Sequence, residues 1–295
     1  MTFRHRCRRA REVLEKSISQ LRPLLALVAL ATGCVSTLPA TQLPADDPRP
    51  GALLAAWHAT AAHRAALQAV ARLAVDAQGA GADGRDLALR SKQRMWLAAP
   101  AQLRVEVLGF LDTTLAVLVT DGERYALFET QEQRFEEGAV YPGLLWDAAR
   151  LALTPAEAVE VILGAPEPDA GLTRGAAYLV GERVRIELAD PGGRVRRVVE
   201  FGAGGELRRL AQSDERGEVA WEALFDDFTE VSGAPFARSV ALRSSSGRTR
   251  AELVLRDVEL NPNVPPDIFQ LRPPGSKLDP NTRSDAPVGA RAEGG

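Results

Sequence analysis

Alternating apolar and polar residues predict a mainly β protein with some helix. We expect a single long curved antiparallel sheet, a half-open barrel of ten or eleven strands covered by helices. In the stretches 183–188 (RVRIEL) and 218–226, every second residue is apolar, as in a sheet with one covered face. Turn signals such as Pro191-Gly192-Gly193 separate these runs at hairpin spacing. Two stretches, 51–68 and 142–163, show helical spacing instead, and we expect them to cover the sheet.

Composition excludes several classes of protein. The 295 residues are 45% hydrophobic and 25% charged, so the chain has enough apolar side chains to form a core. No apolar run reaches the roughly 18 residues that span a bilayer as a helix. The formal net charge is −3, but residues 1–33 carry +5, which leaves −8 for the rest. An acidic body argues against a nucleic-acid partner, because nucleic-acid binding needs cations that displace phosphate counterions.

The N-terminus predicts an exported lipoprotein. Residues 1–33 have the form of a signal peptide, in which a basic segment precedes the short apolar run 23–31 (PLLALVALA). The segment 30–34 (LATGC) resembles the lipobox of bacterial lipoproteins, whose cysteine is acylated and becomes the first residue of the mature chain. After cleavage, Cys34 would be the only cysteine, so no internal disulfide could form. We therefore expect Cys34 to be lipidated and to anchor the protein.

The remaining sequence divides into three parts. Residues 34–50 hold the acylated cysteine and a proline-rich tether. Residues 51–273 form one folded domain, and residues 274–295 are polar and read as a disordered tail. The domain begins with an Ala-rich helix that places Leu54 and Trp57 on one face.

The alternation also assigns side chains to the covered face of the sheet. A sheet of this length curls, and a partly closed sheet with helices at its mouth encloses an apolar cavity. We predict that the cavity and its lid are formed by Val105, Val107, Leu115, Val117, Val159, Ile162, Leu163, Val184, Ile186, Leu188, Trp221, Leu253 and Leu255.

The lid is predicted at the helix over 154–163. Thr154-Pro155-Ala156-Glu157 has the pattern of a capping box with proline at the first helical position. The apolar stripe that follows is narrow and ends at Gly164. Because a narrow stripe is typical of a helix covered on one side, we expect a removable cover over the sheet.

No arrangement of residues points to catalysis, a metal or a cofactor. His58 and His63 are five residues apart on a helix, so their side chains point about 140° apart and do not converge on a metal. Residues 79–84 (GAGADG) match a dinucleotide-binding glycine pattern, but strand-like residues follow where a helix must receive the phosphates. Adjacent acidic residues such as Glu136-Glu137 diverge on a strand. We therefore predict a protein that is not an enzyme and has no cofactor.

The order of these features resembles the LolA–LolB–RseB superfamily, which includes a periplasmic lipoprotein carrier and an outer-membrane lipoprotein receptor. The likeness extends over about 51–260, and the second half of this chain is longer. Residues 109–115 (GFLDTTL) are similar to the receptor's loop with an exposed leucine, which Leu111 matches. Further similar segments are 121–125 (DGERY), 154–166 (TPAEAVEVILGAP) and 246–253 (SGRTRAEL).

The resemblance implies a lipid-anchored protein on the periplasmic face of the outer membrane of a Gram-negative bacterium. It would bind acyl chains of lipoproteins or related lipids and assist their delivery to the outer membrane. Phe110 and Leu111 would form a membrane-insertion loop, and a periplasmic carrier protein would be a partner. The alternative is a non-transporting envelope lipoprotein of the same fold, acting as an assembly factor, scaffold or sensor for a protein partner. A continuous empty cavity would favour the first function, and a cavity filled by side chains would favour the second.

Overall fold

The computed structural model describes residues 39–81, 83–166, 171–244, 247–265 and 267–273. The chain divides into two units, Met1–Pro39 and Ala40–Gly295, and all described helices and strands belong to the second. The predicted signal peptide, Cys34 and the predicted tail at 274–295 lie outside the described residues. Within the described ranges, no helix is long and apolar enough to cross a membrane.

One antiparallel sheet organises the second unit, which confirms the predicted fold class. Its 14 strands exceed the predicted ten or eleven, partly because one of them falls in the predicted tether. The strands are β1 (Ala40–Gln42), β2 (Ala66–Ala77), β3 (Leu87–Ala98), β4 (Gln102–Leu108), β5 (Thr114–Thr120), β6 (Arg124–Glu129), β7 (Arg134–Ala139), β8 (Thr173–Val180), β9 (Arg183–Ala189), β10 (Val195–Phe201), β11 (Leu207–Ser213), β12 (Val219–Val231), β13 (Ala234–Ser244) and β14 (Thr249–Leu260).

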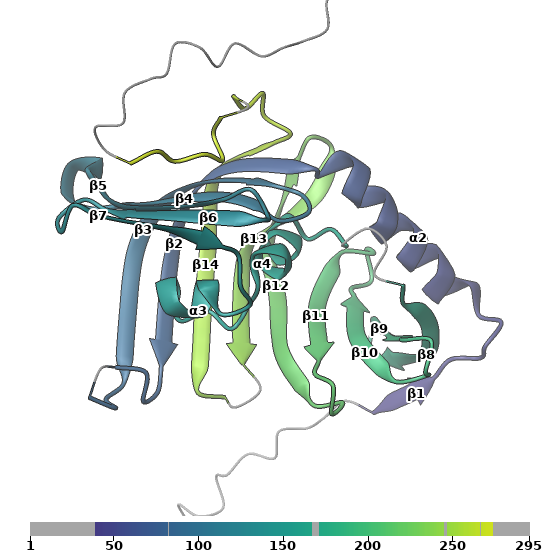
Figure 1. The fold of residues 1–295 in the computed structure, drawn as a ribbon. Coiled ribbons are helices and arrows are strands. Elements are labelled where there is room, and N and C mark those ends of the chain that lie inside the picture. The colour runs from purple at the N-terminus through teal and green to yellow at the C-terminus, as the bar shows by residue number, and fades with distance from the viewer. Residues whose placement is uncertain (1–38, 82, 167–170, 245–246, 266, 274–295) are drawn as a thin grey trace, which may run out of the picture. The chain divides into compact units, whose positions relative to one another are not determined.

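The sheet consists of two runs of hairpins that meet in its middle. The strand order is β1-β8-β9-β10-β11-β12-β13-β14-β2-β3-β4-β5-β6-β7, so β1 and β7 are the edges and the sheet is not closed. The junction is the pairing of β14 with β2, in which Leu253 lies opposite Leu73. Figure 1 shows the sheet curling around two short helices, α3 (Leu144–Ala149) and α4 (Pro155–Leu163). The longer α2 (Pro48–His63) lies beside the β8–β11 end.

The folded unit begins earlier than predicted. The Asp47 carboxylate accepts a hydrogen bond from the backbone N–H of Arg49 at 2.9 Å and so caps α2. Pro48 stands in the first turn, where its missing N–H leaves no helical bond unmade. Upstream of the cap, β1 pairs with β8. The structure therefore differs from the predicted boundary at residue 51, because Pro48 and Pro50 of the predicted tether stand in α2.

Helix α4 is buried on more sides than the one-sided cover that the sequence predicts. The predicted capping box is present: Thr154 Oγ1 accepts from the Glu157 N–H at 3.2 Å, and the Glu157 carboxylate accepts from the Thr154 N–H at 2.8 Å. However, side chains are buried around most of the helix, namely Pro155, Ala158, Val159, Glu160, Val161 and Leu163. The helix therefore forms a plug inside the curled sheet.

Polar contacts fasten α4 to three other elements. Arg197 of β10 donates two hydrogen bonds to the Glu160 carboxylate, at 2.6 and 3.1 Å, and both side chains are less than a tenth exposed. Trp221 of β12 donates from Nε1 to the Glu157 carboxylate at 2.9 Å. Trp57 of α2 donates to the backbone carbonyl of the residue that caps the C-terminus of α4, at 3.1 Å. Moving α4 would therefore break a buried ion pair, which is strongly unfavourable.

Helix α3 is attached by fewer contacts. It has only six residues, and its N-cap, Gly143, makes no side-chain hydrogen bond. Leu144 and Leu145 are buried beneath it, whereas the Trp146 side chain is 37% exposed. Of the two helices inside the sheet, α3 is thus the one that can shift at lower cost.

A smaller apolar cluster lies on the outer face of the sheet. Phe269, from the segment that follows β14, packs with Val117 and Val119 of β5. Trp96 of β3 is partly buried against the same cluster. The segment around Phe269 therefore covers the back of the strands whose other side chains face inward.

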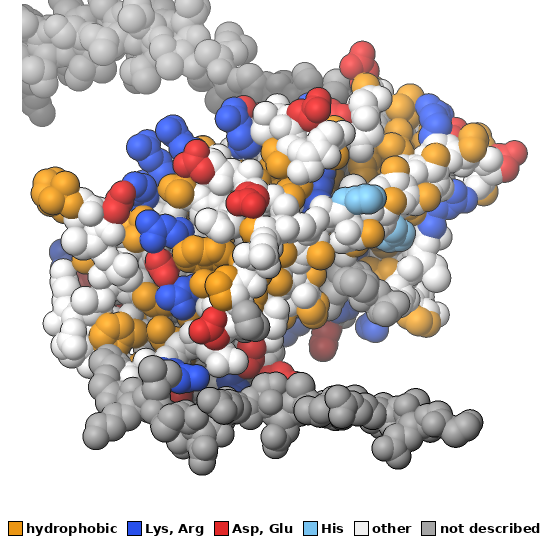
Figure 2. Space-filling view, turned by 90° about the horizontal axis from the view of Figure 1, so that it is seen from above, with side chains coloured by type: hydrophobic (Ala, Val, Ile, Leu, Met, Phe, Trp, Pro, Cys, Tyr) orange, Lys and Arg blue, Asp and Glu red, His pale blue; other side chains and the backbone are white. Residues whose placement is uncertain are grey.

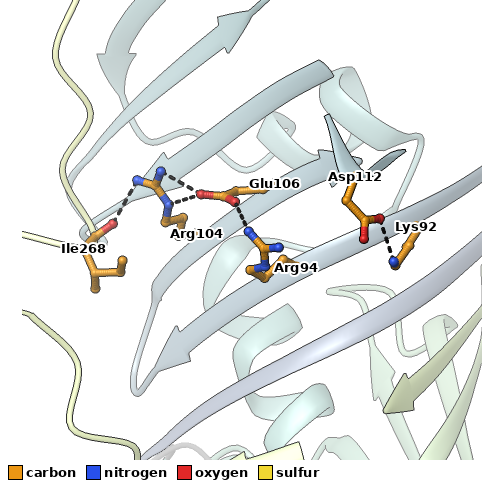
Figure 3. Close-up of polar contacts among 6 residues, drawn as sticks. All are labelled: Lys92, Arg94, Arg104, Glu106, Asp112 and Ile268. Atoms are coloured by element: carbon orange, nitrogen blue, oxygen red, sulfur yellow. Dashed lines mark hydrogen bonds and ion pairs between the residues drawn. The ribbon is translucent and has the colours of Figure 1, made fainter. Parts of the chain in front are cut away.

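A charged cluster adjoins this apolar cover (Figure 3). The Glu106 carboxylate binds Arg104 at 2.9 Å and Arg94 at 3.3 Å. Arg104 also donates to the backbone carbonyl of Ile268 at 3.3 Å. One arginine thus ties the C-terminal segment to the outer face of β4.

Candidate functional site

A cavity of about 330 Å³ lies between the inner face of the sheet and the two short helices. Its walls come from β2–β7, β13, β14, α3 and α4 and the segments that flank the two helices. Most of the lining is aliphatic, and the polar groups lie on β3, β6, β7 and the α3 segment. The apolar lining residues include Leu73, Met95, Leu97, Leu103, Val105, Val107, Ala116, Leu118, Leu127, Leu144, Leu145, Leu151, Leu153, Ala158, Val161, Ile162, Val240, Leu242, Ala251 and Leu253.

Strand register explains how the lining arises. Met95 of β3 lies opposite Val105, which lies opposite Leu118, which in turn lies opposite Leu127. Residues directly opposite each other across an antiparallel sheet point to the same face. This row therefore forms an apolar floor across four strands. It ends at Glu136 of the edge strand β7, opposite Leu127.

A parallel row ends in polar groups on both sides. Gln93 of β3 lies opposite Val107, followed by Ala116 and then Glu129 of β6, which faces Arg134 of β7. All five residues line the cavity. The small Ala116 side chain in the middle of this row leaves space that a larger residue would fill.

The polar rim of the cavity is held together by its own contacts. The Tyr125 hydroxyl donates to the Glu136 carboxylate at 2.7 Å, and the Tyr141 hydroxyl donates to the Asp147 carboxylate at 2.8 Å. The two tyrosine rings meet edge-on, with centroids 5.9 Å apart. The hydrogen bond to Glu136 raises the pKa of Tyr125 to about 12. Both phenols therefore stay protonated at neutral pH, since the bond to Asp147 also raises the pKa of Tyr141.

An ion pair completes the rim. Arg134 and Glu129 lie opposite each other on the edge hairpin, 2.6 Å apart between Nη2 and Oε2. Neither side chain is fully buried, so the pair contributes little stability. Its position is more informative than its energy, because it places the charges of this row at the open edge of the sheet.

Four of the predicted cavity residues line this cavity: Val105, Val107, Ile162 and Leu253. The structure places the others elsewhere. Val117 faces the outer cluster around Phe269, and the Leu115 side chain is 36% exposed. Six others are buried in the main core and do not line the cavity: Val159, Val184, Ile186, Leu188, Trp221 and Leu255. Leu163 is also buried in the core and lines a smaller space of about 120 Å³ between α2 and α4.

The misplacement in β5 has a local cause. Its sequence, TLAVLVT, is apolar on both faces, and the register shifts between Val107 and Leu108 in the pairing of β4 with β5. A one-residue shift exchanges the faces of every following side chain. Ala116 and Leu118 consequently face the cavity in place of Leu115 and Val117.

The polar rim was not found from the sequence. Alternate residues of a strand face the same side of the sheet. The sequence therefore indicates that Tyr125, Leu127 and Glu129 of β6 point one way, and that Arg134 and Glu136 of β7 point one way. The sequence does not indicate that these side chains face the cavity, because both β6 and β7 carry charged residues on each face.

A projecting tip lies at one end of the strands that line the cavity. The side chains of Phe110 and Leu111 are 85% and 82% exposed. They lie in a 3-10 turn (Phe110–Asp112) between β4 and β5, in which Leu111 and Asp112 both have positive φ, 55° and 58°. This conformation is unfavourable for a branched residue such as leucine, so the surrounding contacts must hold it.

The base of the tip is held by hydrogen bonds. Lys92 Nζ of β3 binds the Asp112 carboxylate at 2.6 Å (Figure 3). The Thr113 hydroxyl donates to the backbone carbonyl of Phe110 at 2.9 Å. In the view from above, Figure 2 shows hydrophobic side chains projecting at the left edge of the folded unit, with basic and acidic side chains nearby. The tip is thus an apolar group on a fixed, charged base.

No grouping of three or more His, Cys, Asp or Glu side chains that could hold a metal occurs within the described residues. His58 and His63 lie on α2, with the His58 ring stacked on Trp57 at 5.8 Å. Residues 79–84, of which residue 82 is not described, belong to the connection between β2 and β3.

Comparison with known proteins gives matches among solved structures. No protein family model and no curated protein matches the chain. A LolA superfamily protein from Nitrosomonas europaea matches with a TM-score of 0.48 and 9% identity over 75% of this chain and 97% of that chain. An outer membrane lipoprotein-sorting protein domain from Vibrio parahaemolyticus matches with a TM-score of 0.44 and 10% identity, covering 70% and 89%. A DUF1329 family protein from Desulfovibrio piger matches with a TM-score of 0.48 and 8% identity over 76% of this chain and 98% of that chain.

These matches include the superfamily that the sequence resembles. At such identities and TM-scores the likeness concerns the fold alone, and what the chain does has to be argued from the cavity and the tip.

Proposed function

We propose that this protein is an envelope lipoprotein that binds the acyl chains of lipoproteins or related lipids in its cavity and assists their delivery to the outer membrane. In this proposal Cys34 is acylated and holds the protein on the periplasmic face of that membrane. A periplasmic carrier protein would supply the cargo. The protein would act by binding and releasing its cargo and not as an enzyme.

The single observation that carries this proposal is the apolar cavity. Its volume of about 330 Å³ falls within the range of small-molecule sites, roughly 300 to 1,000 Å³. Transfer of an acyl chain into such a space gains about 0.8 kcal/mol for each methylene removed from water. An aliphatic lining of Leu, Val, Met and Ala side chains makes no directional bonds to an acyl chain, which keeps binding reversible.

The position of the tip supports delivery into a membrane. Val107 lines the cavity and precedes Phe110 by three residues, which is about 10 Å along a strand. An apolar side chain that enters lipid at the tip would therefore bring the end of the cavity close to the bilayer surface. We infer that Phe110 and Leu111 form a membrane-insertion loop.

The groups on the rim are less suited to catalysis than to shaping an entrance. Both tyrosine hydroxyls donate to carboxylates, and Arg134 is paired with Glu129. The bonds to Glu136 and Asp147 raise the pKa of Tyr125 and Tyr141, so neither phenol is activated as a nucleophile at neutral pH.

Filling the cavity tests the proposal. Ala116→Leu adds a side chain in the middle of the lining, and we expect it to abolish displacement of a neutral apolar dye by acyl-chain ligands. Ala241→Leu is the matched control. Ala241 is half-buried like Ala116, but it lies between Val240 and Leu242, which line the cavity, and therefore faces the other side of β13. This variant should leave binding unchanged. Equal binding by wild type and Ala116→Leu, both folded, would remove the cavity as the ligand site and favour a scaffold or sensor role.

A further inference from the structure

The two phenol donors of the cavity rim are occupied by other rim groups. Tyr125 donates to Glu136, Tyr141 donates to Asp147, and Arg134 lies in an ion pair with Glu129. A carboxylate oxygen accepts more than one hydrogen bond, so these acids keep accepting capacity after their pairing. Apart from the Arg134 guanidinium, the rim therefore offers a ligand acceptors more readily than donors.

Gln93 extends this pattern into the cavity. Its side chain lines the cavity although the residue is only 6% exposed. The amide nitrogen Nε2 donates to Ser91 Oγ at 3.1 Å, whereas the amide oxygen Oε1 accepts no hydrogen bond from the described part of the chain. This oxygen is therefore free to accept a hydrogen bond from a ligand in the cavity.

The formal charge of the lining also favours a ligand whose polar end is not anionic. Three carboxylates, Glu129, Glu136 and Asp147, face one guanidinium, Arg134. Beyond the lining, Arg150 comes no nearer than 4.0 Å to Asp147, at the limit of an ion pair. An anionic group that approaches this entrance meets a net negative charge and groups that mainly accept hydrogen bonds.

We propose that the cavity selects amphiphiles whose polar end is an uncharged or ammonium hydrogen-bond donor, and that it rejects amphiphiles with a carboxylate or phosphate end. This rests on the proposed function, because it assumes that the cavity holds the apolar chain. Beyond the proposed function, we infer that Glu136 and Asp147 determine which polar end of a ligand the cavity accepts.

Three probes with the same ten-carbon chain separate the possibilities: decan-1-ol, decylammonium and decanoate. Each is titrated at neutral pH, below its micelle concentration, against the full chain carrying Cys34→Ser and a neutral apolar dye. We expect decanoate to bind about tenfold more weakly than decylammonium, the effect of two partly exposed carboxylates. Decan-1-ol should bind more tightly than decanoate as well.

Two variants assign the effect to residues. Glu136→Gln combined with Asp147→Asn keeps an oxygen acceptor for each tyrosine and removes both charges, so decanoate and decylammonium should bind within about twofold of each other. Glu137→Gln is the control, since Glu137 carries the same charge on the opposite face of β7 and lines no part of the cavity. It should keep the tenfold preference.

The outcomes separate this inference from the proposed function. Failure of all three probes to displace the dye would overturn the proposed function, and the inference with it. Tight binding of all three, with decanoate equal to decylammonium, would overturn the inference alone. A preference that survives the Glu136 and Asp147 changes, or that disappears in Glu137→Gln, would show that other residues set the specificity.

Discussion

Glu160 of α4 and Arg197 of β10 meet in a two-point ion pair although 37 residues separate them in the chain. The pair is 3% and 7% exposed at its side chains, so water does not replace either partner. It joins the plug of the cavity to β10, a strand that does not line the cavity. The stability of the cavity wall and that of β10 are therefore linked through this contact.

Removing one member of this pair should destabilise the whole unit. Arg197→Met removes a positive charge and two hydrogen bonds from the buried Glu160 carboxylate, and we expect a loss of about 3–5 kcal/mol in the free energy of unfolding. Urea denaturation measures this. Arg90→Met, which breaks the exposed pair with Asp76, should cost less than about 1 kcal/mol. Equal losses in both variants would contradict a special role for the buried pair.

Replacing the exposed leucine of the tip should affect delivery and not folding. Leu111→Glu should change the free energy of unfolding by less than about 0.5 kcal/mol, as at other surface positions. It should leave dye binding intact and abolish transfer of a fluorescent acyl cargo into liposomes. Val219→Glu changes an exposed apolar residue on β12, which does not line the cavity, and should not affect transfer. A large loss of stability, or unimpaired transfer in Leu111→Glu, would rule out insertion.

Alkaline titration should detect the rim hydrogen bond of Tyr125. Its pKa is raised from 10.0 to about 12 by the bond to Glu136, so the protonated phenol favours the folded state. This contribution is complete below pH 10 and is lost as the pH rises through about 12. Phenolate absorbance should show a midpoint near 12 that disappears in Tyr125→Phe. In Glu136→Gln the midpoint should fall, and an unchanged midpoint would show that the carboxylate is not the cause.

Acylation of Cys34 is open to a direct test. Labelled palmitate should enter the wild-type protein and Cys7→Ser, because residue 7 lies within the predicted signal peptide. It should not enter Cys34→Ser. Two or three acyl chains are needed for a stable anchor, so Cys34→Ser should also be released from membranes. Labelling of Cys34→Ser at the wild-type level would place the modification elsewhere.

Local patterns were sufficient for the fold class and for the capping box of α4. Strict alternation, as in RVRIEL of β9, assigns both the element and its buried face, and Val184, Ile186 and Leu188 are indeed buried. Thr154 and Glu157 form their box within four residues of sequence, so nothing distant decides it. In such segments the local preference and the final structure agree.

Long-range contacts decided what the sequence did not show. Glu160 gave α4 an apparently polar side, but its partner Arg197 is on another element, which makes that side a buried one. The inner face of β5 depends on a register shift beside Leu108 and on the segment around Phe269 that covers its outer face. Neither contact can be predicted from the few residues that define a strand or a helix.

The pairing of β14 with β2 has a consequence for the order of folding. Each half of the sheet consists of neighbouring hairpins, which form quickly because their ends are close in the chain. The two halves join only when Leu253 and Leu73 come together, after everything between them has been made. Because closing so large a loop slows folding, this step should be the slow one. Until it occurs, β2 and β14 are unpaired edges, so the chain is most open to edge-to-edge aggregation before this step.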